Sequence, residues 1–133
     1  MKKSVLWVTS ALVILALFAV AIFLMRPENR VYTENDAEEI IEIGTGEVFI
    51  IELKENPSTG YSWHYTLEPQ ELISLYSDQY TANETENLVG AAGKHEYVFK
   101  AMSAGNAQII FDNYRSWEPD VVEKTYVFNV TVQ

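Results

Sequence analysis

The sequence predicts an all-β protein: an immunoglobulin-like antiparallel β-sandwich of about seven strands, preceded by one N-terminal transmembrane helix. Three observations predict it. After the N-terminal apolar stretch, apolar and polar residues alternate with a period of two. Seven short runs rich in Val, Ile, Tyr and Phe are separated by clusters of Gly, Pro, Asn or Ser. No amphipathic helix of any length follows the apolar stretch. Seven such strands in about 95 residues are typical of a sandwich of immunoglobulin size.

The first element is an apolar stretch from Ser4 to Met25, which runs for 22 residues without a charge. At about 1.5 Å per residue, a helix of this length spans a hydrocarbon core of roughly 30 Å. The stretch ends without a small-x-small cleavage site and without a lipidation cysteine. We therefore expect residues 1–26 to form an uncleaved membrane anchor, with its helix over about residues 4–25. A long cleaved signal peptide, which would give a secreted protein, is the alternative.

Charges at the two ends of this stretch predict its orientation. Lys2 and Lys3 favour a cytoplasmic N-terminus, although Arg26 and Arg30 flank the other end and weaken that preference. We expect a single-pass protein of the cell membrane whose C-terminal domain lies outside the cytoplasm.

An acidic, polar segment follows, and residues 27–38 are predicted to be a tether before a sandwich domain over residues 39–133. Outside the anchor, six basic residues face nineteen acidic ones, a net charge near −13. Such a surface repels nucleic acid and anionic lipid headgroups. The chain has no cysteine, which excludes a disulfide scaffold, a thiolate metal site and a cysteine nucleophile. Apolar burial must therefore stabilise the domain.

The predicted strands are the alternating runs Glu38–Ile43, Glu47–Leu53, Tyr61–Leu67, Leu72–Tyr80, Glu96–Met102, Ala107–Tyr114 and Lys124–Val132. Most of the connections between them are ordinary turns. Three are long or unusual in composition, and these are the candidate functional segments.

The first unusual connection, Asn56 to Tyr61, reads Asn-Pro-Ser-Thr-Gly-Tyr. Pro57 restricts its own φ and pushes Asn56 toward extended geometry, and Gly60 can take a positive φ. Asn56 or Ser58 can also bond nearby backbone groups. The loop is therefore expected to be stiff, which lowers the entropy lost on binding a partner. A rigid corner that only sets strand register explains the same residues equally well.

The second unusual connection contains Gly90, Ala91, Ala92 and Gly93. These residues offer almost no side chain, so another backbone could approach closely. A phosphate site does not fit, since no helix begins here and no lysine stands in Walker spacing. A mobile surface turn is the alternative.

The third connection places Arg115 two residues before Trp117, with Pro119 after them. Arginine and aromatic residues are the types most often found as interface anchors. A tryptophan buried under its own loop is the alternative. In a sandwich of this kind the second-to-third and sixth-to-seventh strand connections emerge at the same end, and alternation of strand direction places the glycine connection there too. All three are expected to be neighbours.

Together these three segments resemble the loop motifs of the chagasin-type inhibitors of papain-like cysteine proteases. The resemblance covers nearly all of residues 39–133 in the same order, and the first motif is specific. Two positions depart from the family pattern. Ala92 stands where the family usually has glycine, and Ser116 replaces the proline of the family's Arg-Pro-Trp.

The resemblance implies an inhibitor whose three loops fill the protease cleft as a wedge. Pro57 to Gly60 would lie over the catalytic cysteine and histidine of the protease, with Thr59 nearest the cysteine. Trp117 would pack on the primed side with Arg115 beside it, and Gly90 to Gly93 would lie along the unprimed side. The predicted protease-binding residues are Asn56, Pro57, Ser58, Thr59, Gly60, Tyr61, Gly90, Ala91, Ala92, Gly93, Arg115 and Trp117.

Other functions remain to be weighed. The main rival is a membrane-tethered immunoglobulin-like adhesion or assembly module that binds a non-protease partner, because sandwiches host many functions. A third reading keeps the fold without the activity, with Ala92 and Ser116 as signs of drift. An enzyme is not expected, since neither a Gly-x-Ser-x-Gly elbow nor a His-x-x-x-His pair accompanies His64 and His95. No cofactor or metal is expected, because residues 33–39 lack the spacing of a calcium loop. We expect a monomer.

Overall fold

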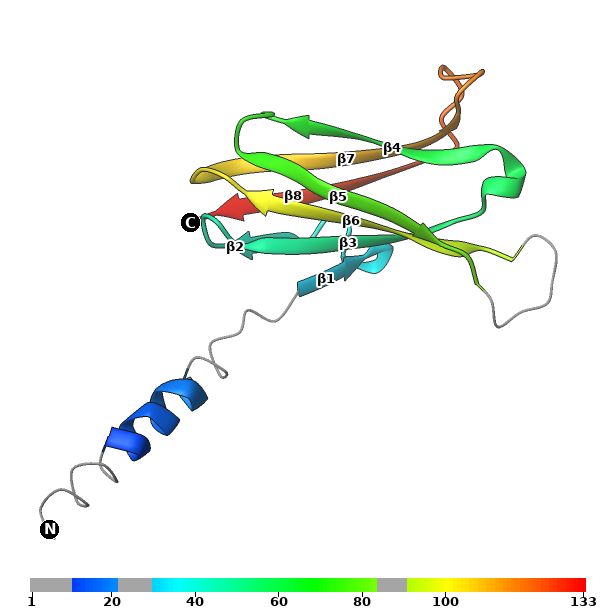
Figure 1. Cartoon of the computed structure of the whole chain (residues 1–133). Coiled ribbons are helices and arrows are strands. Elements are labelled where there is room, and N and C mark those ends of the chain that lie inside the picture. Colours follow the sequence, from blue (N-terminus) through cyan, green and yellow to red (C-terminus); the bar gives the residue numbers. More distant parts are fainter. Residues whose placement is uncertain (1–10, 22–29, 84–90) are drawn as a thin grey trace, which may run out of the picture.

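A computed structural model describes residues 11–21, 30–83 and 91–133. Its main body is a β-sandwich of eight strands within the described residues (Figure 1). The elements are β1 (Arg30–Thr33), η1 (Glu34–Asp36), β2 (Ile40–Ile43), β3 (Val48–Glu55), η2 (Pro57–Thr59), β4 (Tyr61–Glu68), β5 (Ile73–Thr81), β6 (Gly93–Ala101), β7 (Gly105–Arg115) and β8 (Lys124–Val132). Each of the seven predicted runs forms a strand, so the all-β sandwich is confirmed.

Over the described residues the strands form two four-stranded sheets, in the orders β1-β3-β6-β5 and β2-β8-β7-β4. The central pairs β3–β6, β5–β6, β4–β7 and β7–β8 are antiparallel, as predicted. β4 and β5 form the edges on one side of the sandwich, and β1 and β2 form the edges on the other.

The sequence reading missed β1 and two parallel pairs. β1 lies inside the segment predicted as tether, and it pairs in parallel with β3, with Tyr32 opposite Ile51. β2 likewise pairs in parallel with β8. β1 reads Arg-Val-Tyr-Thr and lies in a polar, acidic segment without an alternating apolar pattern. Its Tyr32 packs edge-on against Phe49. Neither pair is joined by a hairpin, so no tight turn forces the strands to be antiparallel.

The core lies between the sheets and is built on four phenylalanines that are fully buried, Phe49, Phe99, Phe111 and Phe128. Phe49 stacks on Phe99 within one sheet at 5.8 Å between ring centroids, and Phe99 meets Phe111 of the other sheet edge-on at 6.2 Å. Each occupies an inward position of an alternating strand. Apolar burial without disulfides therefore holds the two sheets together, as expected from a chain without cysteine.

The N-terminal prediction is tested only in part. Residues 11–21 are helical, with every residue exposed. Residues 4–10 and 22–25, which complete the predicted span, lie outside the described residues. Within the part of the chain that is described, no helix has the length and apolar character needed to cross a membrane.

Candidate functional site: three loops at one end of the sandwich

Strand register places the three unusual connections at one end of the sandwich. At the end of β3, Glu55 lies opposite Gly93, the first residue of β6, and Thr81 at the end of β5 lies opposite Lys94. In the other sheet, Tyr61 at the start of β4 lies opposite Arg115 at the end of β7. The η2 turn and the β7–β8 connection project from this end, away from the C-terminus (Figure 1). The strand ends that carry the three loops therefore lie at one end of the sandwich, as predicted, whereas residues 84–90 of the second loop lie outside the described residues.

The central loop is a short 3-10 turn held by its own side chains. The Asn56 side chain accepts hydrogen bonds from the Ser58 backbone N–H at 3.2 Å and the Ser58 hydroxyl at 2.6 Å. The Thr59 hydroxyl donates to the Asn56 carbonyl at 2.8 Å, and its oxygen accepts from the Tyr61 N–H at 3.3 Å. Pro57 occupies the first turn, where its missing N–H costs nothing. The predicted stiffness thus has an identified cause in each residue of the loop.

Gly60 ends this turn in the left-handed region, with φ of 79°. A Cβ built on Gly60 would lie 2.4 Å from Cη2 of Trp117. The indole of the third loop therefore packs directly on the backbone of the first. Trp117 remains 66% exposed, so the alternative of a tryptophan buried under its own loop is wrong.

Arg115 ties the two loops together. Its Nε donates to the Thr59 carbonyl at 3.2 Å. Its guanidinium lies 4.5 Å from the centroid of the Tyr61 ring and 5.8 Å from that of Trp117, and it pairs with Glu118 at 3.6 Å. Arginine can donate a hydrogen bond and stack on aromatic rings at once. The side chain is thus engaged within the chain on several sides.

The second loop is described only at its C-terminal end, and Gly90 lies outside the described residues. Ala91 is partly buried, Ala92 is exposed, and Gly93 is buried at the start of β6. A Cβ on Gly93 would lie 2.3 Å from the Thr81 carbonyl oxygen, so only glycine fits there. Gly93 therefore belongs to the stem of the second loop, where its missing side chain lets β5 and β6 lie close to each other.

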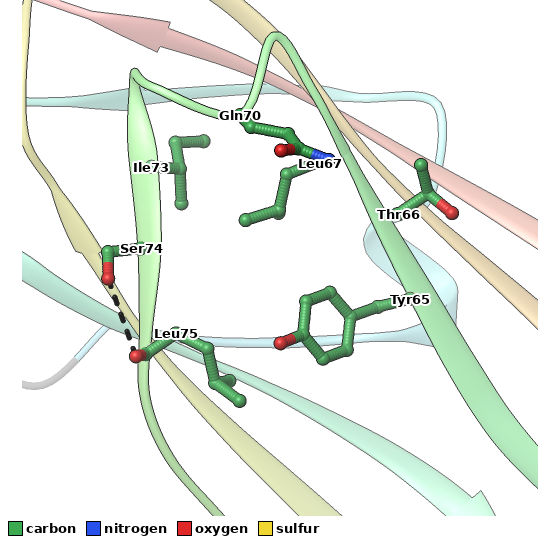
Figure 2. A pocket seen from close by; sticks show the side chains of 7 residues that line it. All are labelled: Tyr65, Thr66, Leu67, Gln70, Ile73, Ser74 and Leu75. Carbon is green, nitrogen blue, oxygen red and sulfur yellow. Dashed lines mark hydrogen bonds between the residues drawn. The ribbon is translucent and has the colours of Figure 1, made fainter.

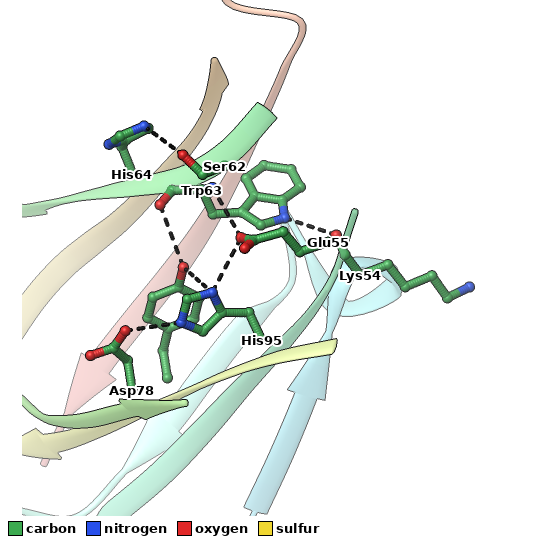
Figure 3. A network of polar contacts seen from close by, with 8 residues as sticks. Lys54, Glu55, Ser62, Trp63, His64, Asp78 and His95 are labelled. Carbon is green, nitrogen blue, oxygen red and sulfur yellow. Dashed lines mark hydrogen bonds and ion pairs between the residues drawn. The ribbon is translucent and has the colours of Figure 1, made fainter. Parts of the chain in front are cut away.

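Beneath the loops lies a polar cluster that was not predicted from the sequence: Glu55, Trp63, Asp78, His95 and Tyr97, here called the stem network. Figure 3 shows the first four of these residues. Glu55 precedes the first loop, and its carboxylate accepts from the Trp63 backbone N–H at 3.2 Å. His95 contacts Glu55 through Nδ1 at 3.2 Å and Asp78 through Nε2 at 2.9 Å. The sequence held a signal for this cluster, because Glu55 immediately precedes Asn56 of the first loop and His95 follows Gly93 of the second loop by two residues.

Tyr97 lies deepest in the stem network and is 2% exposed. Its hydroxyl contacts the His95 Nδ1 at 3.2 Å and the Trp63 carbonyl at 3.4 Å. Burial, reinforced by the negative charges of Glu55 and Asp78, raises the pKa of Tyr97 well above its ordinary value. The phenol is therefore neutral in the folded protein under ordinary conditions.

Two hollows accompany these elements. A cavity of about 240 Å³ lies behind the loops and is lined by residues that include Asn56, Thr59 and Ala92. A larger one, about 490 Å³, lies between the edges β4 and β5, where Tyr65, Leu67 and Ile73 face one another (Figure 2). The larger hollow contains none of the predicted site residues and no charged side chain.

No metal site emerges. Among the described residues no group of three or more His, Cys, Asp or Glu side chains is arranged to hold a metal ion. His64 stacks on Tyr114 with 3.8 Å between the ring centroids, and its Nε2 lies at hydrogen-bond distance, 3.1 Å, from the Ser62 hydroxyl.

Comparison with known proteins assigns the chain to one family. Residues 42–132, more than half of the chain, match the family described as "Chagasin family peptidase inhibitor I42". The chain belongs to the chagasin family. This chagasin-family chain is 29% identical over 101 residues to Amoebiasin-1 of Entamoeba histolytica, a match that covers 76% of the chain and 97% of that protein.

Two solved structures share the fold of this chagasin-family chain. The cysteine protease inhibitor EhICP2 of Entamoeba histolytica superposes with a TM-score of 0.68 at 24% identity, covering 78% of this chain and 94% of that one. PbICP-C, solved in complex with falcipain-2, superposes with a TM-score of 0.58 at 22% identity, covering 81% and 93%. Family membership favours peptidase inhibition over the adhesion module and over catalysis.

Proposed function

We propose that the chain is a reversible inhibitor of papain-like cysteine endopeptidases of the cathepsin L type, and that it blocks the protease cleft with the three loops at one end of its sandwich. Pro57 to Gly60 lie over the catalytic cysteine and histidine of the protease, with Thr59 nearest the cysteine. Trp117 packs on the primed side, and the glycine loop, residues 90–93, lies along the unprimed side.

One observation carries this proposal: the first and third loops are already assembled as a unit, with Trp117 packed on Gly60 and Arg115 bonded to the Thr59 carbonyl. A pre-ordered surface loses less conformational entropy on binding, roughly 0.5–1.5 kcal/mol for each side chain already immobilised. A structural relative, PbICP-C, was solved bound to falcipain-2, which supports a protease as the partner class.

Resistance to cleavage follows from the same rigidity. Hydrolysis requires a carbonyl at attack distance from the nucleophile, with its oxygen in the oxyanion hole. The Thr59 carbonyl is engaged by the Arg115 Nε, and the loop is held in a 3-10 turn. An extended, substrate-like geometry would have to break these bonds first. Steric exclusion is then sufficient for inhibition.

The test is a titration of the purified chain against papain and a cathepsin L-type enzyme, with a serine protease as the control. We expect reversible, stoichiometric inhibition of both cysteine proteases and none of the serine protease. Intact inhibitor should be recovered from the complex. Equal inhibition of the serine protease, or progressive cleavage within residues 56–61, would contradict the proposal.

Trp117→Ala is the most direct test of the loop surface. Trp117 is exposed yet held in place, which suits a binding anchor, and we expect its removal to weaken inhibition of papain by about 2 kcal/mol or more. Tyr76→Ala is the matched control, because Tyr76 is also an exposed aromatic residue, 77% accessible, but lies within β5 away from the loops. The control should leave the inhibition constant unchanged.

The location of the chain is part of the proposal. The uncharged stretch of residues 4–25 supports a single-pass anchor that presents the inhibitor domain outside the cytoplasm as a monomer. Expression of the whole chain and of a chain lacking residues 1–26, followed by membrane fractionation and alkaline extraction, tests this. The whole chain should resist extraction, the shorter one should remain in solution, and light scattering should give a monomer mass for the latter.

A further inference from the structure

We propose that His95, in its doubly protonated form, is a positioning residue for the inhibitory loops, and that the loops consequently loosen as the pH rises. This inference rests on the proposed function for its inhibition readout. It concerns residues that make no part of the predicted protease-binding set.

Each ring nitrogen of His95 lies against a carboxylate, and Nδ1 also lies 3.2 Å from the Tyr97 hydroxyl. Nδ1 lies 3.2 Å from the Glu55 carboxylate and Nε2 lies 2.9 Å from the Asp78 carboxylate. A neutral imidazole has one N–H and one bare nitrogen, whereas the imidazolium donates from both. Only the charged ring therefore bonds both carboxylates at once. Figure 3 shows His95 between these two groups.

Glu55 connects His95 to the first loop. The Glu55 carboxylate also accepts from the Trp63 backbone N–H at 3.2 Å, and the Trp63 indole N–H donates to the Lys54 carbonyl at 2.9 Å. These two bonds join the end of β3 to the start of β4, the two strands that carry the η2 turn. The Glu55 carboxylate thus closes the stem of the loop that begins at Asn56.

The surroundings make the His95 charge indispensable to Glu55. Facing the ring are Glu55 from β3, Asp78 and Tyr80 from β5, and Tyr97 from its own strand. Within the described residues, His95 is the only basic side chain paired with either carboxylate. Lys94 is engaged elsewhere, with Glu52 and Glu96.

Loss of the His95 proton would leave two neighbouring carboxylates, one of them nearly buried. The Glu55 side chain is 8% exposed and the His95 side chain 15%. A nearly buried carboxylate that keeps only the Trp63 N–H as a donor and has no neighbouring positive charge is costly, so Glu55 would turn toward solvent. This change weakens its bond to the Trp63 N–H. The stem of the first loop then opens, and part of the pre-ordering that favours protease binding is lost.

The experiment measures inhibition constants of the full chain against papain between pH 5 and pH 8, together with three variants. Dividing each variant's constant by that of the unchanged chain at the same pH cancels the protease's own titration. Inhibition by the unchanged chain should weaken with rising pH by roughly three- to tenfold relative to inhibition by His95→Gln. This is the size expected when part of one charge-assisted hydrogen bond is lost.

The other two variants separate this effect from a general structural one. Glu55→Gln keeps an acceptor for the Trp63 N–H without a charge, so most of the pH dependence should disappear while inhibition at pH 8 is retained. His64→Gln removes the other histidine, which lies on Tyr114 outside the stem network, and should follow the unchanged chain at every pH. A His95→Gln profile parallel to that of the unchanged chain would overturn the proposal.

A second readout does not depend on any protease. Nitrogen-15 spectra of the labelled full chain, recorded across the same pH range, report the His95 ring and the backbone amides of Ser58, Thr59 and Trp63. We expect these amide signals to shift with pH in the unchanged chain and not to shift in His95→Gln. Amide shifts that are the same in His95→Gln as in the unchanged chain would refute the coupling. Amide shifts that depend on His95, found together with no inhibition of papain, would refute the proposed function alone.

Discussion

At the scale of single residues, Gly60 shows how one position serves two requirements. It adopts a φ of 79°, a region that L-residues avoid at a cost of roughly 1–2 kcal/mol. It also leaves room for the Trp117 indole, which a Cβ would meet at 2.4 Å. A side chain at this position would strain the turn and displace the tryptophan together.

Gly60→Val should therefore lower both the unfolding free energy and the inhibition of papain, the latter by at least tenfold. Gly46→Val is the matched control: Gly46 also has a positive φ, 85°, but a Cβ there meets nothing within 4 Å. It lies between β2 and β3, at the other end of β3, so it should cost stability and leave the inhibition constant unchanged. Urea unfolding and inhibition of papain are measured for both variants. Equal inhibition constants for Gly60→Val and the unchanged chain would contradict our account of the loop.

Tyr97 is the second residue with a measurable signature. Because burial raises its pKa, the folded state favours the neutral phenol. The resulting stabilisation is present below about pH 10, where an unfolded tyrosine also keeps its proton. Above that pH the unfolded chain releases a proton that the folded chain retains, so the unfolding free energy falls as pH rises.

Tyr97→Phe should flatten this alkaline decline in urea unfolding measured from pH 7 to pH 11. Loss of the hydroxyl contacts should cost about 1 kcal/mol near neutral pH. Tyr76→Phe, at an exposed ring, serves as the control and should keep the parent profile. An alkaline decline of the same steepness in Tyr97→Phe would show that another group causes it.

At the scale of elements, the inhibitory surface is made by contacts between loops. The β7–β8 connection does not carry Trp117 alone, because Arg115 reaches from the end of β7 to the Thr59 carbonyl and stacks near Tyr61. Two loops from different parts of the chain thereby behave as one unit. Ser116, which replaces the proline of the family motif, lies between the two engaged residues, and these contacts supply restraint that the proline would otherwise provide.

Arg115→Lys tests this link while keeping the charge. Lysine lacks the planar fork that bonds Thr59 and stacks on an aromatic ring, so we expect inhibition to weaken by about 1 kcal/mol with little change in stability. Arg30→Lys repeats the substitution at β1, where Arg30 donates to the Glu42 carbonyl at 2.7 Å. The Arg30→Lys control should inhibit papain as strongly as the unchanged chain does. If Arg115→Lys also inhibited papain that strongly, the contact between Arg115 and Thr59 would be irrelevant to binding.

At the scale of the whole molecule, the domain begins earlier than the sequence pattern predicts. β1 covers the edge of β3, and Thr33 caps η1 by a reciprocal pair of bonds with Asp36. Tyr32 is partly buried against Phe49, so its burial contributes less than the roughly 1.5–3 kcal/mol of a fully buried apolar side chain. Residues 30–33 are consequently part of the folded body.

Two shortened chains test this boundary by urea unfolding. A chain that starts at residue 34 should be less stable by about 2 kcal/mol than one that starts at residue 30, because it loses the Tyr32 contact and the edge pairing. The chain that starts at residue 30 should match the full chain. Identical midpoints for both shortened chains would mean that residues 30–33 act only as a tether.

Sequence by itself determined the all-β class, seven of the eight described strands and the position of the stiff loop, because period-two alternation and the geometry of Pro57 and Gly60 are local properties. It also placed the three loops at one end, since antiparallel strand direction alternates along the chain. Tertiary structure alone decided what could not be local. β1 forms only against β3, Trp117 is held by Gly60, and His95 meets Glu55 and Asp78 across three strands. Such contacts join residues up to dozens of positions apart, and only the packing of the two sheets brings them together.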